Sequence, residues 1–162
     1  MERVAVDAVE AAPEGDLTVA RRPLGEALGT TDVAVNHYRL APGEALVGGL
    51  HAHVDQEEVF FVLDGVVTFA TMRDASATPR SVRVAAGEAV GFGRGEYQHG
   101  RNAGDDPAVV LALGAPPDST SGREPRRCEA CGESDYLDTA MVDGELRARC
   151  PVCGTVHDSG LH

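Results

Sequence analysis

Short runs of alternating apolar and polar residues dominate the middle of this chain. A period of two places apolar side chains on one face of a β-strand, and no segment carries the apolar stripe of a long amphipathic helix. We therefore predict an all-β fold. The pattern predicts eight strands in the central region, at residues 33–40, 50–53, 58–63, 66–72, 81–84, 89–92, 98–102 and 108–113.

Turn-forming residues separate these predicted strands. Pro42-Gly43 and Asp64-Gly65 supply tight turns, and residues 104–107 form a loop before the last strand. An open sheet of many short strands would expose unpaired edges, whereas antiparallel strands that close on themselves do not. We predict a single β-barrel over residues 32–115.

The flanking segments lack this alternation. Residues 1–31 contain scattered proline and glycine and predict an irregular arm that packs on the outside of the barrel, with one short strand near residues 17–20. Residues 116–127 are rich in proline, serine and glycine, which is typical of a linker. A separate unit is expected at residues 128–158.

All four cysteines lie in that last unit, as Cys128-x-x-Cys131 and Cys150-x-x-Cys153. Two such pairs, separated by a predicted hairpin with an Asp143-Gly144 turn, match the pattern of a zinc ribbon with a four-thiolate structural site. A unit this short cannot build an adequate apolar core, so the metal would stabilise it. The alternative is a redox pair, but its usual βαβ context is missing. His157 is expected to be a surface residue, because four cysteines complete the shell.

The chain is acidic and contains no lysine. Its 26 acidic and 14 basic residues give a formal net charge of −12, and every basic residue is arginine. This charge makes nucleic acid and anionic membranes improbable partners. The absence of lysine excludes Schiff-base chemistry and lysine-dependent phosphate loops. A GC-rich genome would explain the missing lysine, but adaptation to high internal salt explains the acidic surface as well, and we favour it.

No apolar run is long enough to span a membrane, and the first residues do not resemble a secretory signal. We expect a cytoplasmic protein without a membrane partner.

Candidate metal ligands lie on the second and third predicted strands. His51 and His53 are two residues apart, so their side chains share one face, and Glu58 begins the following strand. Two imidazoles and a carboxylate form the ligand set of a facial triad, which suits Fe, Mn, Ni or Zn and leaves coordination positions open. Glu57 is the alternative carboxylate but has the opposite strand parity.

The spacing of these residues resembles that of the cupin superfamily. His51-x-His53, four residues, Glu58, six residues and Gly65 follow the first cupin motif, and Gly87 to Asn102 follow the second. Two positions of the second motif differ, because Gly93 replaces a proline and Gln98 stands where many cupins have a third histidine. The sequence around residues 95–102 and the C-terminal cysteine pairs resemble small cupin proteins of halophilic archaea.

The fourth position of this site has two candidates. Gln98 fits the motif spacing and can offer its amide oxygen, whereas His99 would face the site only if a bulge re-aimed the strand. Both residues, together with Arg101, are candidates for a role in chemistry. Arg39 or Arg101 would receive a substrate carboxylate, and His37 is a candidate for lining the pocket.

The resemblance implies a jelly-roll barrel (a double-stranded β-helix) with one metal, a small-molecule ligand and a homodimer. It fits a metal-dependent enzyme acting on a small polar metabolite, with dioxygenase-like chemistry favoured over isomerisation or decarboxylation. The alternative is a non-catalytic binding or sensor protein in which the zinc ribbon docks a partner protein or stabilises the barrel.

Overall fold

The computed structural model describes residues 1–12, 19–142 and 144–161 of the chain, and β-strands make up most of its regular structure. Its two helical elements are short, at Val6–Ala8 (η1) and Leu24–Leu28 (α1). None of the described helices has the length and apolar character needed to cross a membrane. The strands are β1 (Ala20–Pro23), β2 (Ala34–Leu40), β3 (Ala52–His53), β4 (Glu57–Asp64), β5 (Val66–Met72), β6 (Arg80–Ala85), β7 (Ala89–Phe92), β8 (Tyr97–Arg101), β9 (Ala108–Ala115), β10 (Gly122–Glu124), β11 (Leu137–Val142), β12 (Glu145–Arg149) and β13 (Val156–Asp158).

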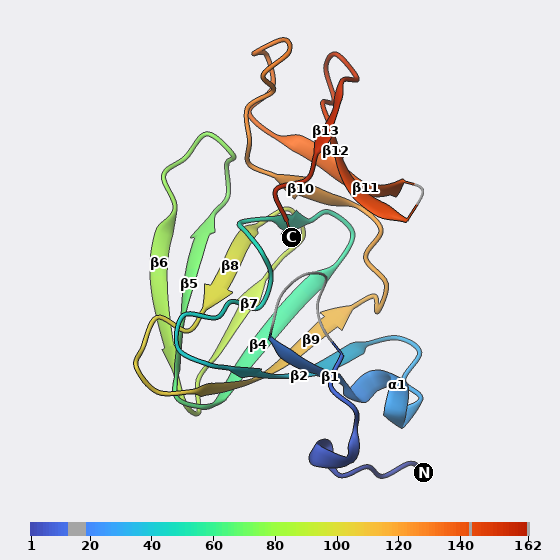
Figure 1. Cartoon of the computed structure of the whole chain (residues 1–162), viewed down its shortest axis with the longest axis vertical. Coiled ribbons are helices and arrows are strands. Elements are labelled where there is room, and N and C mark those ends of the chain that lie inside the picture. The colour runs from blue at the N-terminus through green and yellow to red at the C-terminus, as the bar shows by residue number, and fades with distance from the viewer. Residues whose placement is uncertain (13–18, 143, 162) are drawn as a thin grey trace.

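Two facing antiparallel sheets form the barrel, with strand orders β1-β2-β9-β4-β7 and β6-β5-β8 (Figure 1). All eight strands predicted for this region are present, which confirms the all-β prediction. Inward and outward positions alternate along β9, where every second residue is buried. The period of two in the sequence therefore corresponds to the two faces of the barrel wall.

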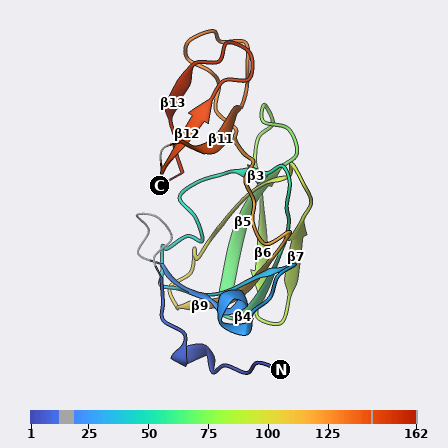
Figure 2. The ribbon, with the colours of Figure 1, turned by 90° about the vertical axis from the view of Figure 1, so that its right-hand side faces the viewer.

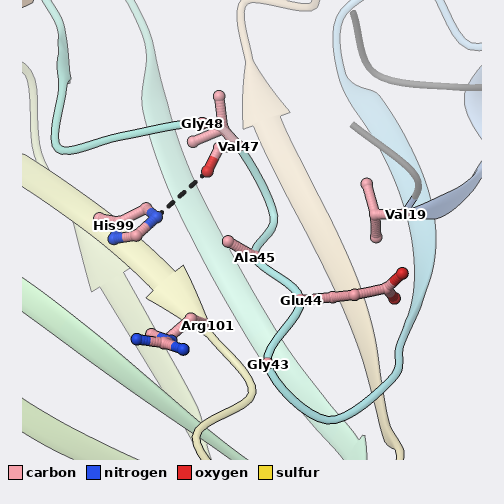
Figure 3. A pocket seen from close by; sticks show the side chains of 8 residues that line it. All are labelled: Val19, Gly43, Glu44, Ala45, Val47, Gly48, His99 and Arg101. Atoms are coloured by element: carbon pink, nitrogen blue, oxygen red, sulfur yellow. Dashed lines mark hydrogen bonds between the residues drawn. The ribbon is translucent and has the colours of Figure 1, made fainter. Parts of the chain in front are cut away.

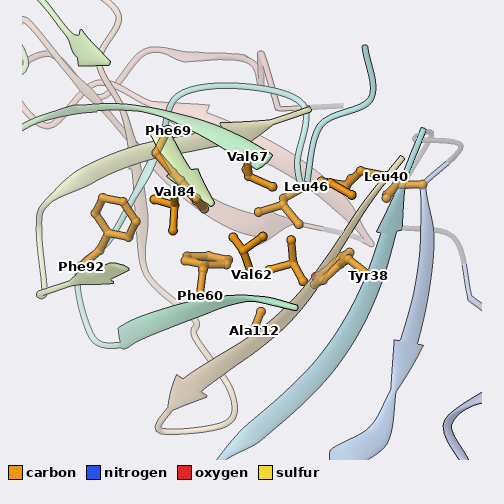
Figure 4. Close-up of a cluster of buried hydrophobic side chains, with 13 residues drawn as sticks. Tyr38, Leu40, Leu46, Phe60, Val62, Val67, Phe69, Val84, Phe92 and Ala112 are labelled. Carbon is orange, nitrogen blue, oxygen red and sulfur yellow. The ribbon is translucent and has the colours of Figure 1, made fainter. Parts of the chain in front are cut away.

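Three phenylalanines form the centre of the barrel core. Phe60, Phe69 and Phe92 pack with ring centroids 5.1 to 5.9 Å apart, in tilted and edge-on arrangements that aromatic rings favour. Aliphatic side chains, among them Val62, Val67 and Val84, pack around them, as Figure 4 shows. A separate, smaller apolar cluster of Ala52, Met72 and Tyr97 lies at β3.

A third sheet joins the barrel to the C-terminal part of the chain. Its order is β13-β12-β11-β10-β3, so a barrel strand and the cysteine-bearing hairpin share one hydrogen-bonded sheet. We call residues 122–161 the C-terminal module, and it lies over one end of the barrel (Figures 1 and 2). Strand β10 belongs to the segment expected to be a linker, and it pairs with β3 on one side and β11 on the other.

The N-terminal arm contributes an edge strand to the barrel. Strand β1 pairs with β2, and Val19 beside it is buried in the barrel core. Residues 17 and 18 of the strand expected near 17–20 lie outside the described residues. Helix α1 follows directly and ends at Gly29, which adopts a left-handed conformation with φ of 67°.

One glycine of the first cupin-like motif has a clear structural role. Gly65 joins β4 to β5 with φ of 74°, and a Cβ atom there would lie 2.7 Å from the carbonyl oxygen of Pro107. Only glycine fits both the backbone conformation and this close approach.

Candidate metal centre

The candidate metal site is built where the segment leading into β3 meets β8. The backbones of His51 and Gln98 exchange two hydrogen bonds, with N···O distances of 3.1 and 2.7 Å. This antiparallel pair directs both side chains to the same face. His53 follows on that face because it is two residues beyond His51.

Glu58 reaches the same point from β4. It has the same strand parity as the core residues Phe60 and Val62, whereas Glu57 is exposed on the outer face. The carboxylate oxygen Oε2 of Glu58 lies 3.4 Å from Nε2 of His53 and 3.0 Å from Nε2 of Gln98. His51, His53 and Glu58 each offer one ligand atom, and these atoms lie within 4.8 Å of one another.

Hydrogen bonds fix the protonation of both imidazoles. Nδ1 of His51 lies 3.0 Å from the carbonyl oxygen of Gly49, which can only accept, so Nδ1 carries the proton. Nδ1 of His53 lies 2.8 Å from Oγ of Ser119. The Ser119 hydroxyl donates its hydrogen bond to the Asp55 carboxylate at 2.7 Å, so it can only accept from His53. Nδ1 of His53 is therefore also the donor. In each ring the lone pair is on Nε2, which points to the centre of the site.

Burial keeps these rings neutral. Loss of solvation lowers the pKa of His51 to about 4, with a further contribution from His53, and it also lowers the pKa of His53. The carboxylate of Asp55 stays ionised because hydrogen bonds, first that from Ser119 and then those from Thr120, lower its pKa to about 2. Neutral imidazole is the form that binds a metal ion.

The arrangement fits a divalent cation. Nε2 of His51 and Nε2 of His53 are 3.2 Å apart, so two lone pairs and the Glu58 carboxylate face one another. Ligand atoms bound at about 2.1 Å and at right angles lie about 3.0 Å apart, close to the distances seen here. A cation would relieve the mutual repulsion of these acceptors, and the donor set suits Fe, Mn, Ni or Zn.

Gln98 occupies the fourth position of this site. Its amide nitrogen lies 3.2 Å from Nε2 of His51 and donates to Glu58, while its buried Oε1 has no hydrogen-bond partner among the described residues. A half-turn of the amide would point Oε1 at the cation position. His99 lies on the other face of β8, and its Nε2 is 3.1 Å from the carbonyl oxygen of Val47 (Figure 3).

The other candidate residues lie away from the metal ligands. Arg101 and His99 line a separate pocket of about 340 Å³, and Arg39 is exposed. His37 is opposite Arg22 in the β1–β2 pair, and burial lowers its pKa. Asn102 is buried, and it hydrogen-bonds to the backbone of Leu40, Gly104 and Asp106. This asparagine of the second motif has a structural role here.

A large cavity opens from the metal ligands. Its volume is about 1110 Å³, and both the barrel and the C-terminal module line it. Arg21 lines it from the N-terminal arm and donates to Asn36 at 3.2 Å. Met141, Leu146 and Arg147 line it from the module. Sequence reasoning missed these residues, because the contribution of an arm and a C-terminal hairpin to one cavity depends on tertiary packing.

The four cysteines form a second group able to hold a metal ion. The Sγ atoms of Cys128 and Cys153 are 3.7 Å apart, and those of Cys131 and Cys150 are 3.8 Å apart. A tetrahedron with Zn–S bonds of about 2.3 Å has edges of about 3.8 Å. All four thiols are free, so the cluster fits a zinc-ribbon-like module.

Two backbone turns and a histidine lie next to the cysteine cluster. The backbone N–H groups of Gly132 and Gly154 donate to the carbonyl oxygens of Cys128 and Cys150, so each cysteine pair forms the same tight turn. His157 is half-buried, and its Nε2 lies 3.6 Å from Sγ of Cys128. The histidine expected at the surface therefore contacts a thiolate of the cluster.

Comparison with known proteins agrees with this geometry. Residues 36–114 match the sequence family described as the cupin domain. The barrel has the cupin fold. Both glycine-framed motifs and the three candidate ligands fall inside the matched residues, whereas Ser119 and the cysteine-bearing hairpin of the C-terminal module lie outside them. No functionally curated protein matches the chain in sequence.

Several solved structures share the cupin fold. A protein of Acidithiobacillus ferrooxidans with a provisional assignment as a sugar phosphate isomerase is 20% identical, with a TM-score of 0.62 over 87% of this chain and 81% of its own. A sugar phosphate isomerase of the cupin superfamily from Silicibacter pomeroyi is 16% identical, with a TM-score of 0.60 over 96% and 92%. A predicted oxalate decarboxylase from Thermotoga maritima is 21% identical, with a TM-score of 0.58 over 70% and 97%. At these identities the likeness establishes the fold alone.

Proposed function

We propose that this protein binds one divalent metal ion through His51, His53, Glu58 and Gln98, and binds a small polar metabolite in the cavity beside it. The observation that carries the proposal is the convergence of two neutral imidazole Nε2 atoms and a carboxylate within 3.2 to 3.4 Å. A cation would stabilise such a cluster of acceptors, and burial disfavours a proton in its place.

The metal ion would be Fe, Mn, Ni or Zn. When bound, it would act as a Lewis acid, or as an oxygen-binding centre if it is iron. The chain's own residues would hold and orient the ligand, and Arg21 and Arg147, which both line the cavity, carry positive charge that would attract an anionic group. Dioxygenase-like chemistry is our preferred reaction class. The related structures described as an isomerase and a decarboxylase support metabolite-directed chemistry in general.

The four cysteines would hold a structural zinc ion. The proposal also includes a cytoplasmic homodimer adapted to high salt.

Elemental analysis of the full-length protein tests the metal sites together, because it should give two metal ions per chain. The double variant His51→Ala/His53→Ala should retain one, bound to the cysteines. His99→Ala is the matched control, since His99 lies on the opposite face of β8 and should leave both ions in place. One metal ion in both the wild type and the double variant would refute the barrel site.

A non-catalytic sensor is the second candidate function. It is favoured by the direct contact of the C-terminal module with the ligand cavity, because a ligand there would touch Arg147 and Leu146 of the module. Incubation of the metal-loaded protein with small carboxylic acids and sugar phosphates separates the two functions. Product formation supports an enzyme, whereas an increase in melting temperature without turnover supports a sensor.

A further inference from the structure

A residue outside the cupin domain orients one of the candidate metal ligands. Ser119 accepts a hydrogen bond from Nδ1 of His53 at 2.8 Å and donates one to Asp55 at 2.7 Å. The chain Asp55–Ser119–His53 fixes both the rotation of the imidazole and the position of its proton. Such outer partners of metal-binding histidines tune metal affinity.

Asp55 also fixes the backbone around Ser119. Its second carboxylate oxygen accepts hydrogen bonds from the backbone N–H of Thr120 at 2.9 Å and from the Thr120 hydroxyl at 3.1 Å. One residue further on, the carbonyl oxygen of Ser121 accepts from the backbone N–H of Val54 at 2.8 Å. The segment that carries Ser119 is therefore bound along the strand that carries His53.

The C-terminal module keeps this segment in place. Strand β10 has only three residues and lies between β3 and β11, with Gly122 opposite both His53 and Thr139. A Cβ atom on Gly122 would lie 2.5 Å from the Thr139 hydroxyl, so a side chain at this position would displace Thr139. Glu124, at the end of β10, is buried and accepts hydrogen bonds from Ser159 and Gly160 near the end of the chain.

We propose that Ser119 is a positioning residue for the barrel metal and that the folded C-terminal module holds Ser119 against His53. The proposal rests on the metal site proposed above. Metal binding and folding are coupled in small units of this kind, so loss of the metal proposed for the cysteines should weaken the barrel site as well. The cysteine cluster thereby controls the metal affinity of a site on a different part of the chain.

Mn²⁺ is a suitable probe, because it prefers nitrogen and oxygen ligands and leaves the cysteines to zinc. The dissociation constant for Mn²⁺ would be measured on full-length protein that holds one zinc ion per chain, by electron paramagnetic resonance of the free ion. Ser119→Ala should raise it by about 10- to 100-fold, and Ser119→Thr, which keeps the hydroxyl, should restore it. Ser76→Ala is the matched control, since it removes an exposed serine hydroxyl whose hydrogen bond, at 2.8 Å, goes to Asp74.

Zinc content and a second variant separate positioning from misfolding. Ser119→Ala should still hold one zinc ion per chain, and Cys128→Ser/Cys131→Ser should weaken Mn²⁺ binding at least as much as Ser119→Ala. Unchanged Mn²⁺ affinity in Ser119→Ala would overturn the inference, as would failure of Ser119→Thr to restore it. Absence of Mn²⁺ binding in the wild type, equal to that of His51→Ala, would instead overturn the proposed metal site itself.

Discussion

The protonation of two histidines decides what the barrel site can bind. Gly49 and Ser119 each accept a hydrogen bond from Nδ1 of one imidazole, so both Nε2 lone pairs point to a common centre. The sequence predicts this pair from its spacing alone, because residues two apart share a strand face. It does not predict Ser119, which lies 66 positions beyond His53 in a segment with no strand pattern.

The sequence pattern alone also does not decide whether Gln98 or His99 faces the metal site. Both are consistent with a site residue if a bulge is allowed, and only the register of β8 decides between them. In the structure, the backbone pair between His51 and Gln98 places Gln98 beside the histidines.

We predict that metal-free protein loses stability as the pH falls from 6.5 to about 4. Burial lowers the pKa of folded His51 to about 4, whereas in the unfolded chain it titrates near 6.5, so the unfolded state binds more protons between these values. The loss in free energy of unfolding would reach about 3 kcal/mol, at about 1.4 kcal/mol per pKa unit.

Chemical denaturation at several pH values measures this effect, on protein that retains one zinc ion per chain and has no metal ion in the barrel. The variant His51→Gln lacks the titrating group, and its stability should depend less on pH over the same range. Parallel pH profiles for the wild type and the variant would contradict the assigned environment of His51.

Among the secondary-structure elements, long apolar strands were predictable and short strands were not. Strands β4 and β9 have eight residues each and are mostly apolar, so the sequence predicts them, whereas the alternating burial along β9 is seen only in the structure. Strands β10 and β13 have three residues each and no alternation of their own. Pairing with neighbouring strands stabilises them, and the few residues of each short strand do not reveal which strands those neighbours are.

We predict that Gly122→Val destabilises the protein and loosens the C-terminal module from the barrel. The new side chain would collide with Thr139 and approach the carbonyl oxygen of Ala52, since a Cβ atom there lies only 2.5 Å and 3.4 Å from them. Overpacking of this kind costs about 1–3 kcal/mol.

Thermal unfolding checks this prediction, with Gly91→Val as the control. Gly91 lies on β7, and a Cβ atom there would meet its nearest neighbours at 3.8 Å. Equal melting temperatures for the two variants would show that β10 tolerates a side chain and is not closely packed between barrel and module.

For the whole molecule, the barrel and the C-terminal module form one ligand cavity. The sequence predicts two units joined by a linker, and the composition of residues 116–127 supports that interpretation. In the structure, those residues supply Ser119 and strand β10. A barrel truncated before Ser119 would lack the partner of His53, so metal binding is best measured on the full chain.

We predict that molar KCl raises the melting temperature of this protein. A net charge of −12 makes the folded chain repel itself, and dissolved salt screens this repulsion. Thermal unfolding over a series of KCl concentrations measures the effect, with sucrose at matched osmolality as the control. Undiminished stability at low salt would contradict adaptation to a saline cytoplasm.

Anomalous diffraction from crystals of the manganese-loaded protein tests the barrel metal site most directly. We expect one manganese peak bounded by Nε2 of His51, Nε2 of His53 and the carboxylate of Glu58, with Oε1 of Gln98 turned toward it. A peak beside His99, or no peak in the barrel of protein that retains its zinc, would contradict the assignment of these four residues as the metal centre.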